Sequence, residues 1–199
     1  MYRKKAGCFR HHLLLWYAVN VAMRRQGKGT DLRNQVLKSK ARELVNQTLE
    51  RSVEVRSLGI DRGTVRFMPI DPAALAISDE WERCPYPWRA VPEWKLKDPK
   101  GLDLALWHAQ ELCGLCYATP RRSRLRISII LLEGQPTESH PLKRLVAPLM
   151  LTAVGVYAQL LRCKVIQIER PEPGVVNYYQ TLGFEFDTAG CLVISADRF

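Results

Sequence analysis

Apolar and polar positions in the last third of the chain follow three successive patterns. From Leu149 to Leu161, apolar residues recur at helical spacing, and residues 164–169 then alternate as a strand does. A second helical pattern runs from Val175 to Leu182. Gly183 supplies the left-handed residue that ends a helix, and Phe184 opens another strand. The spacing therefore predicts helix, strand, helix and strand, in that order.

The middle of the chain predicts strands interrupted by short helices. Asp71 is placed to cap a helix that begins at Pro72, because a proline at the first helical position loses no hydrogen bond. Prolines and aromatic residues between 84 and 94 favour an ordered loop that flanks a short helix. The strands predicted here and at the end of the chain are residues 63–69, 102–108, 112–119, 124–132 and 191–195.

The start of the chain predicts two basic helices, at about residues 8–25 and 31–50. On the second helix, apolar residues fall near one side and four cations are expected to be exposed. The apolar residues are Leu32, Val36, Leu44, Val45 and Leu49, and the cations are Arg33, Lys38, Lys40 and Arg42. We interpret the two helices as an appended hairpin. It divides the chain into an extension, residues 1–52, and a domain, residues 53–199.

The net charge of +10 is distributed unevenly along the 199 residues. Residues 1–52 hold 12 Lys and Arg against 3 Asp and Glu, whereas residues 53–199 are nearly neutral. A basic block of this kind favours an acidic partner, such as nucleic acid, an anionic membrane surface or an acidic protein. The alternative is a solvated basic helix face that aids solubility.

The apolar run Leu13–Met23 changes the picture of this extension. It is too short to span a bilayer, and two arginines follow it where a signal peptide would have its cleavage site. We therefore expect no membrane span. The run is interpreted as a helix docked on the domain, on a protein partner such as a second copy of the chain, or at a membrane surface.

Six cysteines lie scattered along the sequence without the dense spacing of a disulfide scaffold. This pattern favours reduced thiols and a cytoplasmic location. Cys113 and Cys116 are three positions apart in a predicted strand, so their side chains are expected on opposite faces. That placement argues against a metal site shared by the two thiols.

The segment VVNYYQTLGFE, Val175–Glu185, resembles the A-x-x-F-Y-x-x-L-G-F-E signature of GNAT N-acetyltransferases. The predicted order of elements over residues 63–197 is also similar to that family. The resemblance implies an α/β fold with a mixed, mostly antiparallel central sheet and flanking helices, to which the N-terminal helical extension is added. It also implies that acetyl-CoA is the cofactor and that an acetyl group is transferred to an amine of an unidentified acceptor, protein or RNA-linked.

The resemblance also assigns roles to particular elements. In the family, the helix matching residues 149–161 presents its N-terminus to the pyrophosphate of acetyl-CoA. The strand matching residues 164–169 parts from its neighbour to admit the pantetheine. The next helix carries a catalytic tyrosine, and Tyr179 takes that position here.

Acetyl transfer to an amine needs one base and one acid beside the thioester. Tyr179 is the expected acid, and the alternative for it is a buried aromatic residue on a helix face. Glu133 ends the expected fourth strand and is the expected base. Glu138 and His140 lie in the loop beyond it and are the other candidates.

The family binds acetyl-CoA with a loop of the form Q/R-x-x-G-x-G/A, because backbone amides must approach phosphate closely at a helix N-terminus. The matching residues 141–149 contain neither glycine. One register places Leu145 and Ala147 at the glycine positions. Another takes Arg144 as the motif arginine, with Ala147 and Leu149 at the glycine positions.

Charge is expected to compensate for the missing glycines, since Pro148 removes an amide donor whereas Lys143 and Arg144 supply cations. The expected cofactor-binding residues are Lys143, Arg144, Leu145, Val146, Ala147 and Leu149. The loop without glycine also favours an alternative function. In that reading, the chain is a GNAT-fold binding module without catalysis, which acts on nucleic acid or a protein partner through its basic N-terminal helices.

Overall fold

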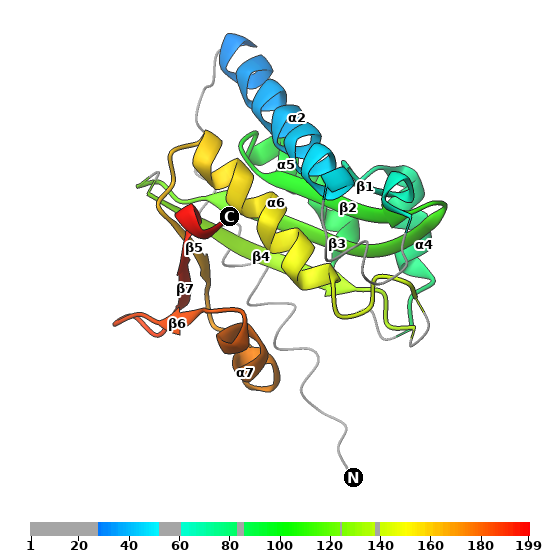
Figure 1. Ribbon diagram of the computed structural model, residues 1–199. Coiled ribbons are helices and arrows are strands. Elements are labelled where there is room, and N and C mark those ends of the chain that lie inside the picture. The colour runs from blue at the N-terminus through cyan, green and yellow to red at the C-terminus, as the bar shows by residue number, and fades with distance from the viewer. Residues whose placement is uncertain (1–27, 52–60, 83–85, 124, 138–139) are drawn as a thin grey trace.

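A computed structural model describes residues 28–51, 61–82, 86–123, 125–137 and 140–199 (Figure 1). Seven strands form one sheet in the order β1-β2-β3-β4-β5-β7-β6. Only β4 and β5 are parallel neighbours, so the expected mixed, mostly antiparallel sheet is confirmed. The strands are β1 Val65–Met68, β2 Leu102–His108, β3 Glu111–Pro120, β4 Arg126–Gly134, β5 Val165–Ile168, β6 Glu185–Phe186 and β7 Leu192–Ser195. The helices are α2 Lys28–Arg51, α4 Pro72–Asp79, α5 Val91–Lys97, α6 Val146–Leu160 and α7 Pro173–Thr181, with short 3-10 helices η1 Arg62–Thr64, η2 Trp88–Ala90 and η3 Ala196–Arg198.

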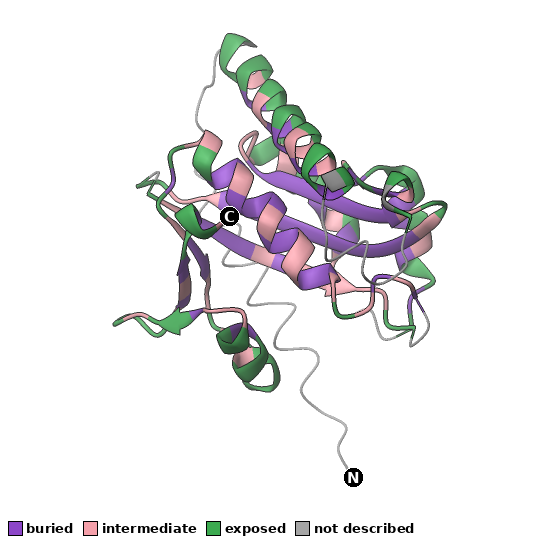
Figure 2. Ribbon diagram, in the orientation of Figure 1, coloured by how far each residue is buried: buried purple, intermediate pink, exposed green. Residues whose placement is uncertain are grey.

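The sheet separates two hydrophobic cores. α2 and α6 lie side by side over one face, which we call the α6 face (Figure 1). Met150 and Val154 of α6 pack there against residues such as Ile166 of β5. The opposite face, which we call the α5 face, packs against Trp88 and Trp94 from η2 and α5. The central strands β2 and β3 are buried almost throughout, whereas β1 alternates and β6 is exposed (Figure 2).

Local sequence signals place the ends of two helices correctly. The side chain of Asp71 accepts a hydrogen bond from the amide of Ala74 at 2.8 Å, and Pro72 is the first residue of α4. Gly183 follows α7 with a left-handed φ of 93°. Phe184 is buried in the core and β6 begins at the next residue, so the strand starts later than predicted.

The buried face of α2 differs from the predicted face. Val45 and Leu49 enter the core of the α6 face as expected, together with Ala41. Leu32 and Val36, predicted to lie with them, are 67% and 58% exposed. The first half of this helix therefore presents apolar side chains to solvent.

Two cations that were predicted to be exposed turn inward instead. Lys38 is 5% exposed, and the half-buried Arg42 donates a hydrogen bond to the carbonyl of Asp103 at 3.3 Å. The charge of the buried Asp103 carboxylate acts on both cations, although this carboxylate already forms a 2.6 Å ion pair with Lys95 and accepts a hydrogen bond from the amide of Ile70. A buried carboxylate requires compensating partners, and apolar periodicity does not record that requirement.

α2 shares its core with the sheet, so this described part of the extension is packed against the domain. The helix expected at residues 8–25 lies outside the described residues, and the division of the chain at residue 52 stays a prediction. Among the helices that the structure describes, none has both the length and the apolar character needed to cross a membrane.

The prediction for the two neighbouring cysteines was wrong. Cys113 and Cys116 both belong to the core beneath α6. The register between β2 and β3 shifts between Leu106 and Trp107, and Cys113 is the residue that is skipped on β3. Such a bulge changes which face the following side chains occupy. Burial raises the pKa of the Cys113 thiol to about 12.

Lys38 gives a stability test of this packing. Burial lowers the pKa of Lys38 below its ordinary value of 10.5, although the charge of Asp103 opposes the shift. The folded state therefore penalises the ammonium, and we expect Lys38→Met to stabilise the protein by roughly 1 kcal/mol at pH 7, because Asp103 keeps its ion pair with Lys95. The native chain gains stability as pH rises from the lowered pKa toward 10.5, because the unfolded state then binds more protons. The advantage of the variant should thus shrink by pH 10.

Urea unfolding of both chains at pH 7 and pH 10 measures this difference. Lys40→Met is the matched control, because Lys40 is exposed on the same helix and pairs with Glu43 at 3.1 Å. A Lys38→Met chain less stable than the native chain at pH 7 would show that attraction to Asp103 outweighs the cost of burial.

Candidate functional site

The parallel strands β4 and β5 separate near the middle of β4. Their pairing ends at Ile129 and Ile168, whereas β4 continues to Gly134 alongside β3. After Ile168 the chain turns away into α7. We call this separation, bordered by residues 130–134 of β4 and by the end of β5, the splay. It leaves one edge of β4 without a neighbouring strand among the described residues.

A bulge lies in β4 where the splay begins. Tyr117 of β3 pairs with Leu131, but the next residue of β3 pairs with Ile129, so Ile130 is skipped. The bulge changes the faces that β4 side chains occupy. Ile129 packs on the α6 face, whereas Leu131 joins the core of the α5 face. Glu133, two residues after Leu131, shares the α5 face.

The loop before α6 keeps several backbone amides available. The amides of Lys143 and Leu145 bond within the loop, and the amide of Leu149 bonds to the carbonyl of Leu145 at 2.9 Å. The amides of Val146 and Ala147 donate no hydrogen bond to another group that the structure describes. Free amides at the start of a 15-residue helix attract anions, as the helix dipole does.

The six residues expected to bind the cofactor fall into different environments. Val146 and Ala147 bury their side chains and offer only their amides, while Leu145 and Leu149 pack against the core of the α6 face. Arg144 is exposed and holds a left-handed backbone, with φ of 70°. Its amide also lacks a described hydrogen-bond acceptor. The amide of Leu149 is used inside the helix, so this residue has no donor to offer.

Tyr179 lies on α7 and is 8% exposed. Its ring packs edge-on against Phe184, with the ring centroids 5.5 Å apart, and lies 5.8 Å from the ring of Tyr178. Burial raises the pKa of Tyr179, and the nearby groups Cys116 and Tyr86 add to the rise. The phenol therefore stays protonated at neutral pH and carries a proton that it can donate.

Glu133 is half-buried on β4 beside the splay. Its carboxylate accepts a hydrogen bond from the indole Nε1 of Trp88 at 2.6 Å. Trp88 lies in η2, and the ring of Tyr86 packs edge-on against it at a centroid distance of 6.3 Å. Tyr86 also contributes to the raised pKa of Tyr179, so it interacts both with Trp88 and with the proposed acid.

The other two candidate bases are not brought near Glu133 or Tyr179 by any described contact. Glu138 lies outside the described residues. His140 is buried, and its Nδ1 has no hydrogen-bond partner among them. Burial lowers the pKa of His140, with Glu111 opposing the shift and Lys143 adding to it. Across the described segments, no three His, Cys, Asp or Glu side chains gather as metal ligands would.

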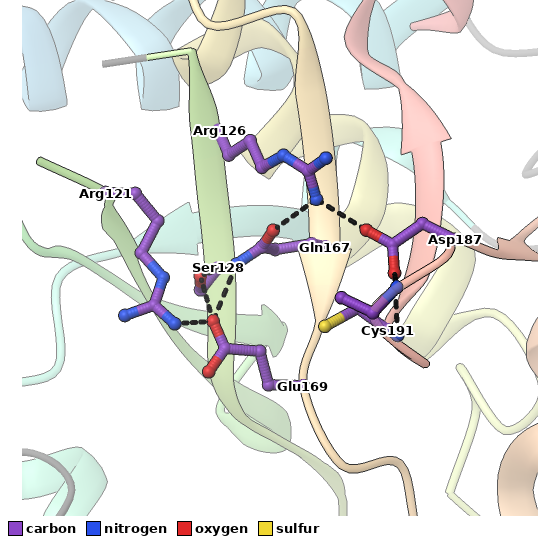
Figure 3. Close-up of polar contacts among 8 residues, drawn as sticks. Arg121, Arg126, Ser128, Gln167, Glu169, Asp187 and Cys191 are labelled. Carbon is purple, nitrogen blue, oxygen red and sulfur yellow. Dashed lines mark hydrogen bonds and ion pairs between the residues drawn. The ribbon is translucent and has the colours of Figure 1, made fainter. Parts of the chain in front are cut away.

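Sequence reasoning missed a polar network on the α5 face, which Figure 3 shows. Gln167 of β5 is 4% exposed and donates hydrogen bonds to Ser128 at 2.8 Å and to Glu169 at 2.6 Å. Glu169 also forms an ion pair with Arg121. Glu169 directly follows the last residue of β5, so this network borders the splay.

A second ion pair extends the network toward β7. Arg126 bonds to the side chain of Gln167 at 3.1 Å and to Asp187 at 2.7 Å (Figure 3). The sequence holds a signal for this face, because polar residues alternate with isoleucine in both strands. Positions 126 and 128 of β4 and 167 and 169 of β5 share that pattern.

Two solved structures share the fold of this chain. A variant of spermidine N-acetyltransferase from Vibrio cholerae superposes with a TM-score of 0.50 at 15% identity, over 68% of this chain and 96% of that one. Ard1 from Thermoplasma volcanium superposes with a TM-score of 0.52 at 11% identity, over 66% and 97% of the two chains. The expected GNAT fold is thereby confirmed. No protein-family model matches the chain, and no curated protein sequence is similar to it.

The start of α6 depends on a close contact with β3 that can be tested. A Cβ atom on Gly114 would lie 2.4 Å from Cγ1 of Val146, the first residue of α6. We expect Gly114→Ala to destabilise the protein by about 1–3 kcal/mol through overpacking, as measured by urea unfolding. Adding Val146→Ala should recover much of this loss. If the double variant is no more stable than Gly114→Ala, the contact does not set the position of the helix.

Proposed function

We propose that this chain is an acetyl-CoA-dependent N-acetyltransferase that acts on an amine. The observation that carries the proposal is the splay, which has free loop amides on one side and a buried, protonated tyrosine beside it. The GNAT fold supports the same reading. The loop amides can bind a diphosphate, and the tyrosine can donate a proton to the sulfur of a thioester.

The available groups fit acetyl-CoA. The amides of Arg144, Val146 and Ala147 would bind the pyrophosphate, and the side chains of Lys143 and Arg144 would add positive charge. The open edge of β4 would receive the amide groups of the pantetheine, because an edge strand offers unpaired N–H and C=O groups. Bound acetyl-CoA supplies an acetyl group activated as a thioester.

The chain supplies the proton transfers. Glu133 accepts a proton from the ammonium group of the acceptor, which makes the nitrogen a nucleophile. The neutral nitrogen would attack the thioester carbon, and Tyr179 would donate its phenolic proton to the sulfur as the C–S bond breaks. The proton that the new amide nitrogen loses would return to the Tyr179 phenolate and restore the acid. The position of Glu133 beside the splay and the neutral, buried phenol of Tyr179 support these roles.

The identity of the acceptor, the cytoplasmic location and the formation of a homodimer stay predictions. So does the binding of nucleic acid or an acidic protein by residues 1–52. Arg33 and Lys40 on α2 are exposed and support such binding, whereas the inward Lys38 and Arg42 do not. We therefore favour catalysis over the binding module as the function of the described domain.

Replacing the proposed acid gives a direct test. We expect Tyr179→Phe to lower kcat roughly 10- to 1000-fold and to leave the affinity for acetyl-CoA nearly unchanged, because only a proton donor is lost. The measurement is thiol release from acetyl-CoA in the presence of an amine. Tyr178→Phe is the matched control, since Tyr178 is the neighbouring residue of α7 and is 41% exposed. Equal turnover in the Tyr179→Phe chain would remove Tyr179 from the mechanism.

A second test separates charge from loop shape at the pyrophosphate site. Replacing Lys143 and Arg144 together with Ala should weaken acetyl-CoA about tenfold or more, but should change the affinity for a pantetheine fragment little. Calorimetric titration measures both ligands. Arg162→Ala is the control, because this exposed arginine has a similar left-handed backbone, φ 61°, beyond the other end of α6. Equal weakening of both ligands would indicate collapse of the loop.

A further inference from the structure

The two faces of the sheet at the splay offer different access. α6 and the loop before it occupy one face, where the pyrophosphate would bind. On the α5 face, β4 and β5 present the polar side chains of Ser128, Gln167 and Glu169 (Figure 3). In the proposed reaction the acceptor amine approaches from the α5 face, opposite to α6. Glu133 lies on that same face because of the bulge at Ile130.

Trp88 connects this carboxylate to the rest of the α5 face. Its ring is 2% exposed and belongs to the core formed by α4, α5 and the sheet. Its single polar atom, Nε1, donates to Glu133 Oε2 at 2.6 Å. A buried indole has little rotational freedom, so the carboxylate that it holds is also fixed in direction. Trp88 thus links η2 to the edge of the splay.

The donor that Trp88 provides to Glu133 differs from the donors at two other buried or half-buried carboxylates. Asp103 pairs with Lys95, and Glu169 pairs with Arg121, so each negative charge is met by a positive one. Trp88 offers a neutral N–H group and brings no counter-charge of its own. Such a donor favours the ionised carboxylate over the protonated acid but does not cancel its charge.

We propose that Trp88 is a positioning residue for the reaction, which holds Glu133 ionised and aimed at the acceptor on the α5 face of the splay. The inference rests on the proposed function, in which Glu133 takes a proton from the acceptor ammonium. Trp88 touches neither the acceptor nor the reacting atoms in this role. Tyr86, packed against Trp88 and close enough to Tyr179 to affect its pKa, ties the same segment to the acid.

Trp88→Phe in the full chain tests the inference, because phenylalanine keeps much of the ring and removes the N–H donor. We expect the pKa of Glu133 to rise by about one unit, which is about tenfold in the acid dissociation constant. NMR titration of 13C-labelled glutamate carboxyl groups measures this shift, and Glu133→Gln assigns the signal. The acid limb of the pH profile of kcat/KM, measured with acetyl-CoA and 1-aminobutane, should move upward by a similar amount.

Trp81→Phe is the matched control. Trp81 belongs to the same core and is 7% exposed, but its Nε1 has no hydrogen-bond partner among the residues described. Removing that N–H should shift neither the Glu133 titration nor the pH profile. The Trp81 variant also reports any general effect of exchanging a buried indole for a smaller ring.

The outcomes separate this inference from the proposed function. Turnover by the native chain with an unchanged Glu133 titration in Trp88→Phe would overturn the role of Trp88 alone. An equal shift in Trp81→Phe would overturn it as well. Absence of transfer by the native chain, despite a shifted titration, would overturn the proposed function and with it a catalytic purpose for the hydrogen bond.

If Trp88→Phe fails to fold, the NMR resonance of the Trp88 indole N–H in the native chain tests the inference instead. The Trp88 N–H resonance should move with pH at the pKa of Glu133, and it should become insensitive to pH in that range in Glu133→Gln. An indole resonance that is affected neither by pH in this range nor by Glu133→Gln would overturn the inference.

Discussion

The parallel pairing of β4 with β5 is the constraint on which the site depends. A parallel neighbour cannot be reached by a tight turn, so the chain must cross over one face of the sheet, and α6 makes this crossing. The helix consequently begins at the end of β4, where the strands have already separated. The tyrosine helix α7 leaves the same end of β5. The β4–α6–β5 crossover and the start of α7 thereby bring the loop amides, the open edge of β4 and Tyr179 to the same end of the sheet.

Packing and electrostatics have different roles on the α5 face. Large aromatic rings fill the core beneath α4 and α5. The carboxylates of Asp103 and Glu169 are matched by cations, whereas Trp88 gives Glu133 a neutral donor. Desolvation makes both arrangements effective, because interactions strengthen away from water.

The sequence predicted the order of elements and the helix that carries Tyr179, because these rest on apolar periodicity and on the stop at Gly183. It did not predict the bulges at Cys113 and Ile130, which arise only when two strands are paired. The sequence also mispredicted the buried face of α2, because Lys38 is buried near the carboxylate of Asp103, which is distant in sequence. The loop amides that have no described hydrogen-bond acceptor belong to the backbone, so the identities of the side chains do not reveal them.

The bulge at Cys113 also gives the molecule internal reporters of its own motion. Cys113 and Cys116 lie beneath α6, and burial raises the pKa of both thiols, so neither forms the reactive thiolate at neutral pH while the helix is docked. Alkylation of these thiols requires partial detachment of α6 from the sheet. Their labelling rate therefore measures the free energy of local opening at the element that would hold the ligand, without any probe being introduced.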